Sequence, residues 1–198
     1  MSKLHAIIKT SSGRTAEVDF PIARPEFKKL IRELTMDDPD GRWSFDGFLV
    51  CSAAEGRALE RCKNLSEINY YGHIVSRFSD EDWRRYQFLL DAGVAEWETV
   101  RNLINIAANV NHYCCFKIAS YAELGRFLRE GNPNYPTFAD PSEKTLRNAG
   151  KQYAKQKHGK FYDGYYVEQN DLWNSIYNGD PKTIPEQYQL RIEESEER

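Results

Sequence analysis

The residues of this chain that offer chemistry are a group of carboxylates between residues 80 and 98. Three consecutive acids follow Ser79, and three more precede residue 100, with arginines among them. The group consists of Asp80, Glu81, Asp82, Asp91, Glu96 and Glu98, and Glu67 is a possible further member. Acids at the start of a helix stabilise its dipole by about 0.3–1 kcal/mol each, and this is the interpretation that the residues favour. The alternative is a phosphate-like row that a DNA-binding groove would accept.

A second group of residues combines lysines with aromatic side chains. It consists of Lys151, Lys155, Lys157 and Lys160 with Tyr153, Phe161, Tyr162, Tyr165 and Tyr166. Such a basic and aromatic patch can bind single-stranded nucleic acid, because the bases stack on aromatic rings. The favoured interpretation is a solvated helix face beside a hairpin whose alternate aromatic residues are core, because nothing else in the chain extends the patch. Direct nucleic-acid binding through residues 151–166 is therefore kept only as a distant alternative.

Signatures of enzymes are missing from the sequence. It contains no phosphate-binding G-x-x-x-x-G-K-[ST], no G-x-G-x-x-G after a strand, no H-E-x-x-H and no G-x-S-x-G. The acids of DDPDG (residues 37–41) lack the spacing of a calcium loop and are interpreted as a helix end and turn. We therefore expect no catalytic residue, no cofactor and no metal ligand.

The cysteines and histidines support the same expectation. Cys51, Cys62, Cys114 and Cys115 form no C-x-x-C pair, and the four histidines are scattered. This pattern predicts neither a disulfide framework nor a zinc site, and it is typical of a reducing cytosol.

Composition is that of a globular protein with nearly balanced charge. Of the 198 residues, 40% are hydrophobic and 29% are charged, and the net charge is −3. No window is long and apolar enough for a membrane span, and the N-terminus does not resemble a signal peptide, so we expect a cytoplasmic protein without a membrane partner. Residues 1–65, 66–130 and 131–198 carry formal charges of +1, −2 and −2. This balance indicates neither a general nucleic-acid binder nor an extreme acidic mimic.

The first part of the chain, residues 1–63, reads as a ββαβ unit. Strands are predicted at 4–10 and 15–22, a helix at 25–34, and a buried strand at 43–53. This order predicts a short sheet with a helix on one face.

Residues 64–131 read as mainly helical. Asn64 with Glu67 predicts the start of one helix, and Ser79 with Asp82 predicts the next, which ends at Gly93. A further helix is predicted from about Glu96, then a strand at 112–119, and then a helix capped by Ser120 that ends at Gly131.

Residues 132–198 open with a proline-bearing linker at 132–141. Asp140, as the N-terminal cap, and Pro141 predict a helix that runs to about His158 and is stopped by Gly159. A β-hairpin is predicted around Asp163-Gly164, then a short helix at 171–179, an extended segment at 184–190 and a frayed tail.

The order of three segments resembles that of the ArdA-type antirestriction proteins of mobile genetic elements. The segments are LSEINYYGHIVSRF (65–78), LLDAG with VRNLINIAANVNHY (89–93 and 100–113), and the run from NAGKQYAKQKHGKFYDGYYVEQND onward (148–180). SYAELGRFL (120–128) also resembles the family's helix after its central strand. The resemblance covers roughly residues 64–191.

This resemblance implies an α+β fold of three small α/β subdomains in a row, here 1–63, 64–131 and 132–198, in an elongated chain that can form a homodimer. It also implies a non-enzymatic inhibitor in a bacterial cytoplasm that imitates DNA and occupies the DNA groove of a type I restriction–modification enzyme. B-DNA carries about one charge per 1.7 Å of axis, so a net charge of −3 predicts partial mimicry at most. A relative retargeted to a CRISPR effector or another antiphage complex by direct protein–protein contact therefore remains the alternative.

Overall fold

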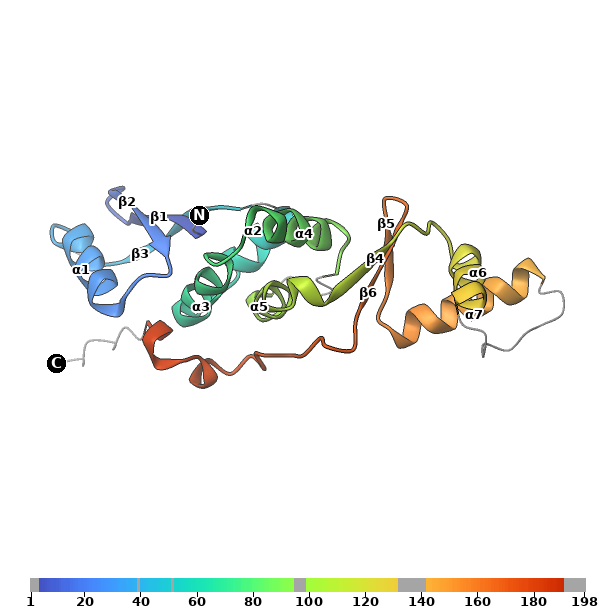
Figure 1. Ribbon diagram of the computed structural model, residues 1–198. Helices are drawn as coiled ribbons and strands as arrows, with labels where there is room; N and C mark the ends of the chain where they lie inside the picture. Colours follow the sequence, from blue (N-terminus) through green and yellow to red (C-terminus); the bar gives the residue numbers. More distant parts are fainter. Residues whose placement is uncertain (1–3, 39, 51, 95–98, 132–141, 191–198) are drawn as a thin grey trace. The chain divides into compact units, whose positions relative to one another are not determined.

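A computed structural model describes residues 4–38, 40–50, 52–94, 99–131 and 142–190 of the chain. It has a mixed α+β fold, as the sequence predicts, with seven α-helices and two three-stranded antiparallel sheets in the described residues (Figure 1). The chain folds into two compact units. Unit 1 takes the described residues of 1–90, 95–108 and 175–198, and unit 2 those of 91–94 and 109–174.

Unit 1 contains the predicted ββαβ order. Strands β1 (Leu4–Thr10), β2 (Thr15–Phe20) and β3 (Trp43–Leu49) form a sheet with the order β2-β1-β3. Alternate residues of β1 are buried, and helix α1 (Arg24–Thr35) packs Phe27 edge-on against Trp43, with ring centroids 5.8 Å apart. The predicted third strand was too long: it ends at Leu49, and an unpredicted helix, α2 (Ala53–Glu60), follows. Ser52 caps this helix by accepting a hydrogen bond from the Glu55 backbone.

The next two helices of the chain begin at the capping residues that the sequence predicts, and a third helix follows them. Helix α3 (Leu65–Val75) is capped by Asn64, whose Oδ1 accepts from the backbone N–H of Ser66 at 2.9 Å. Helix α4 (Asp80–Asp91) begins with the predicted capping box, and Gly93 follows it with φ of 68°. Helix α5 spans Val100–Ala108; its predicted start near Glu96 lies outside the described residues.

The segment 175–190 returns to unit 1 and packs against α3. Asn69, fully buried on α3, donates one hydrogen bond to the carbonyl of Ile22 and another to that of Tyr188. The predicted helix at 171–179 is wrong, because its backbone groups pair elsewhere: Asn105 of α5 accepts from the N–H groups of Ile176 and Tyr177. The predicted extended segment 184–190 instead contains a short 3-10 turn, η3 (Glu186–Tyr188), and another such turn, η2 (Pro181–Thr183), precedes it.

Unit 2 is built around the second sheet. Strands β4 (Tyr113–Phe116), β5 (Lys160–Tyr162) and β6 (Tyr165–Gln169) pair in the order β4-β6-β5, and the 3-10 turn η1 (Val110–His112) precedes β4. The predicted hairpin is confirmed: Asp163 and Gly164 join β5 to β6 with φ values of 47° and 77°. Positive φ at both central residues is the requirement of a tight hairpin turn, and Asp-Gly meets it at little cost.

Two helices, α6 (Tyr121–Gly131) and α7 (Glu143–Gln156), complete unit 2. Their backbones approach closely at Gly125 and Gly150, where a Cβ would collide with the partner helix's backbone. The predicted cap of α7 is wrong, because Ser142, not Asp140, accepts from the Thr145 backbone and precedes the first helical residue. At the other end of α7, the helix ends at Gln156, and His158 rather than Gly159 adopts positive φ.

The division into these two units differs from the predicted division at residues 63 and 131. Segment 175–190 belongs with the first part of the chain, and β4, from the predicted middle part, pairs with the C-terminal hairpin. The predicted linker 132–141 and the tail after residue 190 lie outside the described residues. The three-subdomain arrangement stays a prediction.

Candidate partner-binding surface

Two of the predicted partner-binding carboxylates lie on the surface at the start of helix α4. Asp80 and Glu81 are exposed in the first turn. Asp82 instead completes the capping box: its carboxylate accepts from the backbone and hydroxyl of Ser79 at 3.0 and 2.7 Å, and the Asp82 N–H donates back to Ser79 Oγ at 3.1 Å. The capping box fixes the helix end, so that Asp80 and Glu81 project from a rigid element.

The opposite end of α4 carries Asp91, which is also exposed. Eleven residues separate it from Asp80, so the two acids lie about 16 Å apart along the helix axis and within about 20° of one another around it. An acid in the last turn opposes the helix dipole, so the favoured stabilising explanation does not extend to Asp91. Tyr86, Leu89 and Leu90 anchor the buried side of this helix.

Arginines neutralise part of this face. Arg85 lies 3.9 Å from Glu81, and Arg84 Nε donates to the Asp80 carbonyl at 3.3 Å. Exposed ion pairs of this kind contribute at most about 1 kcal/mol and exchange partners readily. The face of α4 is therefore mixed in charge, with acids at both ends. Glu96 and Glu98 lie outside the described residues.

Glu67 occupies a different environment from the acids of α4. It is half-buried, and its two oxygens accept from Tyr177 Oη at 2.6 Å and from Cys62 Sγ at 3.4 Å. Burial raises the pKa of the Cys62 thiol to about 12 and, with the bond to Glu67, raises the pKa of Tyr177. Both donors therefore stay protonated at neutral pH. In this fold Glu67 ties the returning C-terminal segment to α3.

One further titratable group, Asp38, serves the fold. Asp38, in the predicted turn after α1, accepts from Ser11 Oγ at 2.8 Å and from the Ser12 backbone at 3.0 Å. These bonds hold the pKa of Asp38 well below its usual range. Among the residues that the structure describes, no group of three or more His, Cys, Asp or Glu side chains could hold a metal ion. No helix in those same ranges is long and apolar enough to cross a membrane.

Of the five aromatic residues in the basic and aromatic patch, three belong to the core cluster of unit 2 or pack against it, and two are exposed. Tyr166 is fully buried, and the ring of Phe161 packs against it with ring centroids 5.2 Å apart. Tyr153 donates its hydroxyl to Glu168 at 3.1 Å. Tyr162 and Tyr165, at the hairpin tip, are 36% and 38% exposed. The rings of Tyr153, Phe161 and Tyr166 therefore do not form an open stacking platform for bases.

Three highly exposed apolar side chains have no signal in the sequence. Met36 and Leu49 in unit 1 are each 75% exposed, and Leu172 in unit 2 is 72% exposed. Residues of these types are usually expected in the core, and only the structure shows that they reach solvent.

Charge is nearly balanced in both units. The described residues of unit 1 carry 15 Lys and Arg against 16 Asp and Glu, and those of unit 2 carry 9 against 7. Neither unit therefore presents a strong field of one sign over its described residues.

Comparison with known proteins adds no relative. No protein-family model matches this chain, and no curated protein matches it.

Proposed function

We propose that this protein is a non-enzymatic, ArdA-like inhibitor that binds the DNA-binding surface of a bacterial DNA-targeting defence complex, such as a type I restriction–modification enzyme. The observation that carries the proposal is the exposed acidic face of α4, with Asp80 and Glu81 at one end and Asp91 at the other. Asp80 and Glu81 at the start of this helix are exposed, and the proposal is that basic side chains of the partner's DNA-binding groove contact them. The resemblance of the segments at 65–78, 89–93, 100–113 and 148–180 supports the same class of protein.

Charge density limits this mimicry to part of the contact. A stretch of B-DNA about 16 Å long carries about ten phosphate charges, whereas α4 offers three exposed carboxylates over the same length. Arg84 and Arg85 on the same helix further reduce its net negative charge. The remainder of the interface must come from polar and apolar contacts, as in ordinary protein–protein interfaces.

The second candidate, a relative retargeted to a CRISPR effector or another antiphage complex, is favoured by the exposed apolar side chains. Met36 and Leu49 are well suited to a contact that does not depend on charge. The salt dependence of partner binding distinguishes the two candidates. A contact dominated by α4 carboxylates weakens steeply between about 50 and 300 mM salt, whereas one centred on apolar side chains changes little.

The first test is plating of unmodified phage on a host with a type I restriction system, with and without this protein. Rescue of plating is the expected result. No rescue by soluble protein would contradict the restriction target, and the same assay across CRISPR and other defence systems would then test the second candidate.

A pair of matched variants tests the acidic face of α4. Asp80→Asn with Glu81→Gln removes two exposed charges without touching the capping box, whereas Glu26→Gln with Glu60→Gln removes two exposed charges elsewhere in unit 1. We expect the first pair to reduce rescue and the second to leave it unchanged. Equal rescue by both pairs would exclude this face. Asp82 and Glu67 are unsuitable for this test, because both have structural hydrogen bonds.

The subdomain arrangement and the homodimer belong to the same proposal. Light scattering during size-exclusion chromatography measures the mass in solution. A mass of about twice 23.1 kDa is expected, and a single chain at high concentration would contradict the dimer.

A further inference from the structure

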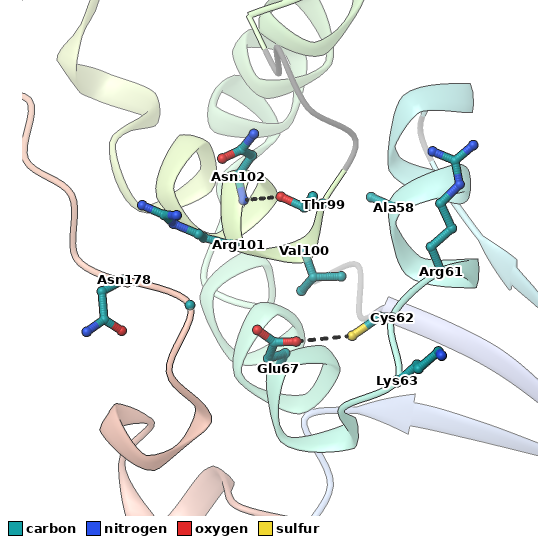
Figure 2. Close-up of a pocket in the computed structure, with 11 residues that line it drawn as sticks. Ala58, Arg61, Cys62, Lys63, Glu67, Thr99, Val100, Arg101, Asn102 and Asn178 are labelled. Carbon is teal, nitrogen blue, oxygen red and sulfur yellow. Dashed lines mark hydrogen bonds between the residues drawn. The ribbon is translucent and has the colours of Figure 1, made fainter.

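Unit 1 contains a cleft of about 800 Å³ that is distinct from the acidic face of α4. It lies between the end of α2, the first turn of α3 and the start of α5, with Asn178 on a further side (Figure 2), and Gly179 also lines it. Ala58 and Val100 are its buried apolar residues. The volume is within the range of sites for small molecules, about 300–1,000 Å³.

Positive charge predominates in this cleft. Arg61 and Lys63 lie on one side, and Arg101 lies on the other (Figure 2). Glu67 is the one acid among the described lining residues, and both its oxygens already accept from protein donors, as described above. Three cations from two segments of the chain and one carboxylate therefore line the cleft, and each oxygen of that carboxylate already accepts a hydrogen bond.

The start of α5 adds polar groups to the cleft and also favours an anion. Thr99 Oγ1 accepts from the Asn102 backbone at 3.3 Å, which fixes the first turn of the helix beside the cleft. The positive end of the helix dipole favours an anion there. The amides of Asn102 and Asn178, on separate segments, also line the cleft.

The position of Arg101 is set by the returning C-terminal segment. The Arg101 stem lies against Gly179, where an added Cβ would meet Arg101 Cδ at 3.2 Å. Gly179 has φ of 95°, a conformation that other residues rarely adopt. The loop at 178–179 thus passes close to the base of this arginine.

We propose that this cleft binds a small ligand that carries a diphosphate group. Arg61, Lys63 and Arg101 against Glu67 give the cleft a formal charge of +2, and a diphosphate has about three negative charges at neutral pH. Guanidinium groups bind phosphate oxygens in pairs, and lysine adds a point charge. None of the described lining residues is aromatic, so recognition rests on the phosphates and not on a stacked base. This binding is independent of the inhibitory function proposed above.

Calorimetric titration with pyrophosphate at low salt tests the proposal on the full chain. We expect saturable binding by the wild type, weakened at least about tenfold by Lys63→Gln with Arg101→Gln. The control pair Lys28→Gln with Arg42→Gln removes the same two charges from exposed positions outside the cleft and should bind as the wild type does. The single variant Arg101→Gln provides a second measurement if the pair unfolds, which circular dichroism would show.

Three results would overturn the assignment. They are no saturable heat with the wild type, equal weakening by both pairs of variants, and tighter binding of a short single-stranded oligonucleotide that Lys63→Gln with Arg101→Gln abolishes. The last result would assign the cleft to a nucleic-acid backbone instead of a small ligand. A titration with ATP extends the test, because a nucleotide should bind no more tightly than pyrophosphate if the phosphates alone are recognised.

Discussion

Replacement of Gly150 by alanine tests how unit 2 is held together, because this residue lies where α7 crosses α6. A Cβ at Gly150 would approach the Tyr121 carbonyl closer than 3.0 Å, a separation that real Cβ atoms essentially never show. The neighbour is backbone, so no side-chain rotation relieves the collision. The two helices must therefore move apart, which also loosens the packing of Leu124 and Ala154 in the core cluster.

The size of the effect follows from two opposing contributions. Overpacking costs about 1–3 kcal/mol, and a collision between two backbones belongs at the upper end of that range. Alanine in place of glycine stabilises the interior of a helix by about 1 kcal/mol. The net loss is about 2 kcal/mol, which corresponds to an increase of about 30-fold in the rate of amide exchange through local opening.

Hydrogen exchange followed by mass spectrometry on peptides from α6 and α7 measures this change without assuming a single unfolding step. Gly131→Ala is the control, because Gly131 lies at the end of α6, the helix that α7 packs against, and its added Cβ would meet nothing within 4 Å. It should exchange at the wild-type rate or more slowly. The double variant Gly125→Ala with Gly150→Ala should lose less than the sum of the single variants, because helices that are already separated no longer collide at the second position. Exchange in Gly150→Ala no faster than in the control would refute this reasoning.

Three further predictions concern unit 1. Tyr71→Phe removes a donor to the buried carboxylate of Glu55 and should lower the free energy of unfolding by about 1–3 kcal/mol in urea; a loss below about 0.5 kcal/mol would contradict this. Asn105→Ala frees both backbone groups of Tyr177, whose amide should exchange at least about tenfold faster by NMR, and an unchanged rate would count against this anchor. Burial, with a smaller effect of Arg77, lowers the pKa of His73 below its ordinary value of about 6.5. The folded state therefore favours the neutral ring, and stability should fall as pH drops below about 6.5. Urea midpoints between about pH 7.5 and 5 should fall more steeply for the wild type than for His73→Gln, and parallel curves would exclude this titration.

The elements that could be predicted from the sequence are those whose signals are local. Asn64 and Ser79 cap their helices by bonding to backbone groups two or three residues away, so the residue types alone identify the helix starts. Asp163-Gly164 meets the φ requirement of its turn without help from the rest of the chain. Alternation in β1 likewise indicates which side chains face the helices.

The elements that could not be predicted depend on distant residues. Segment 171–179 has helical spacing, but Asn105, 72 residues before Tyr177, takes the backbone groups that a helix would need. Helix α2 was missed because its short sequence, AAEGRALE, follows an apolar run that reads as a continuing strand. A short apolar run is ambiguous by periodicity alone.

The same distinction between local and distant partners applies to the candidate site. Glu67 and Glu81 are both acids in the first turn of a helix, so the sequence alone does not show which of them is free to bind a partner. Tyr177, 110 residues after Glu67, makes one of them a structural hydrogen-bond acceptor, while Glu81 stays exposed beside Arg85. A carboxylate is available to a partner only if the fold leaves its oxygens without closer donors, and that property arises from the tertiary structure. The structure therefore shows which of the predicted acids are exposed on α4 and which one, Glu67, is held in a hydrogen bond of the fold, and partner binding through α4 stays a prediction.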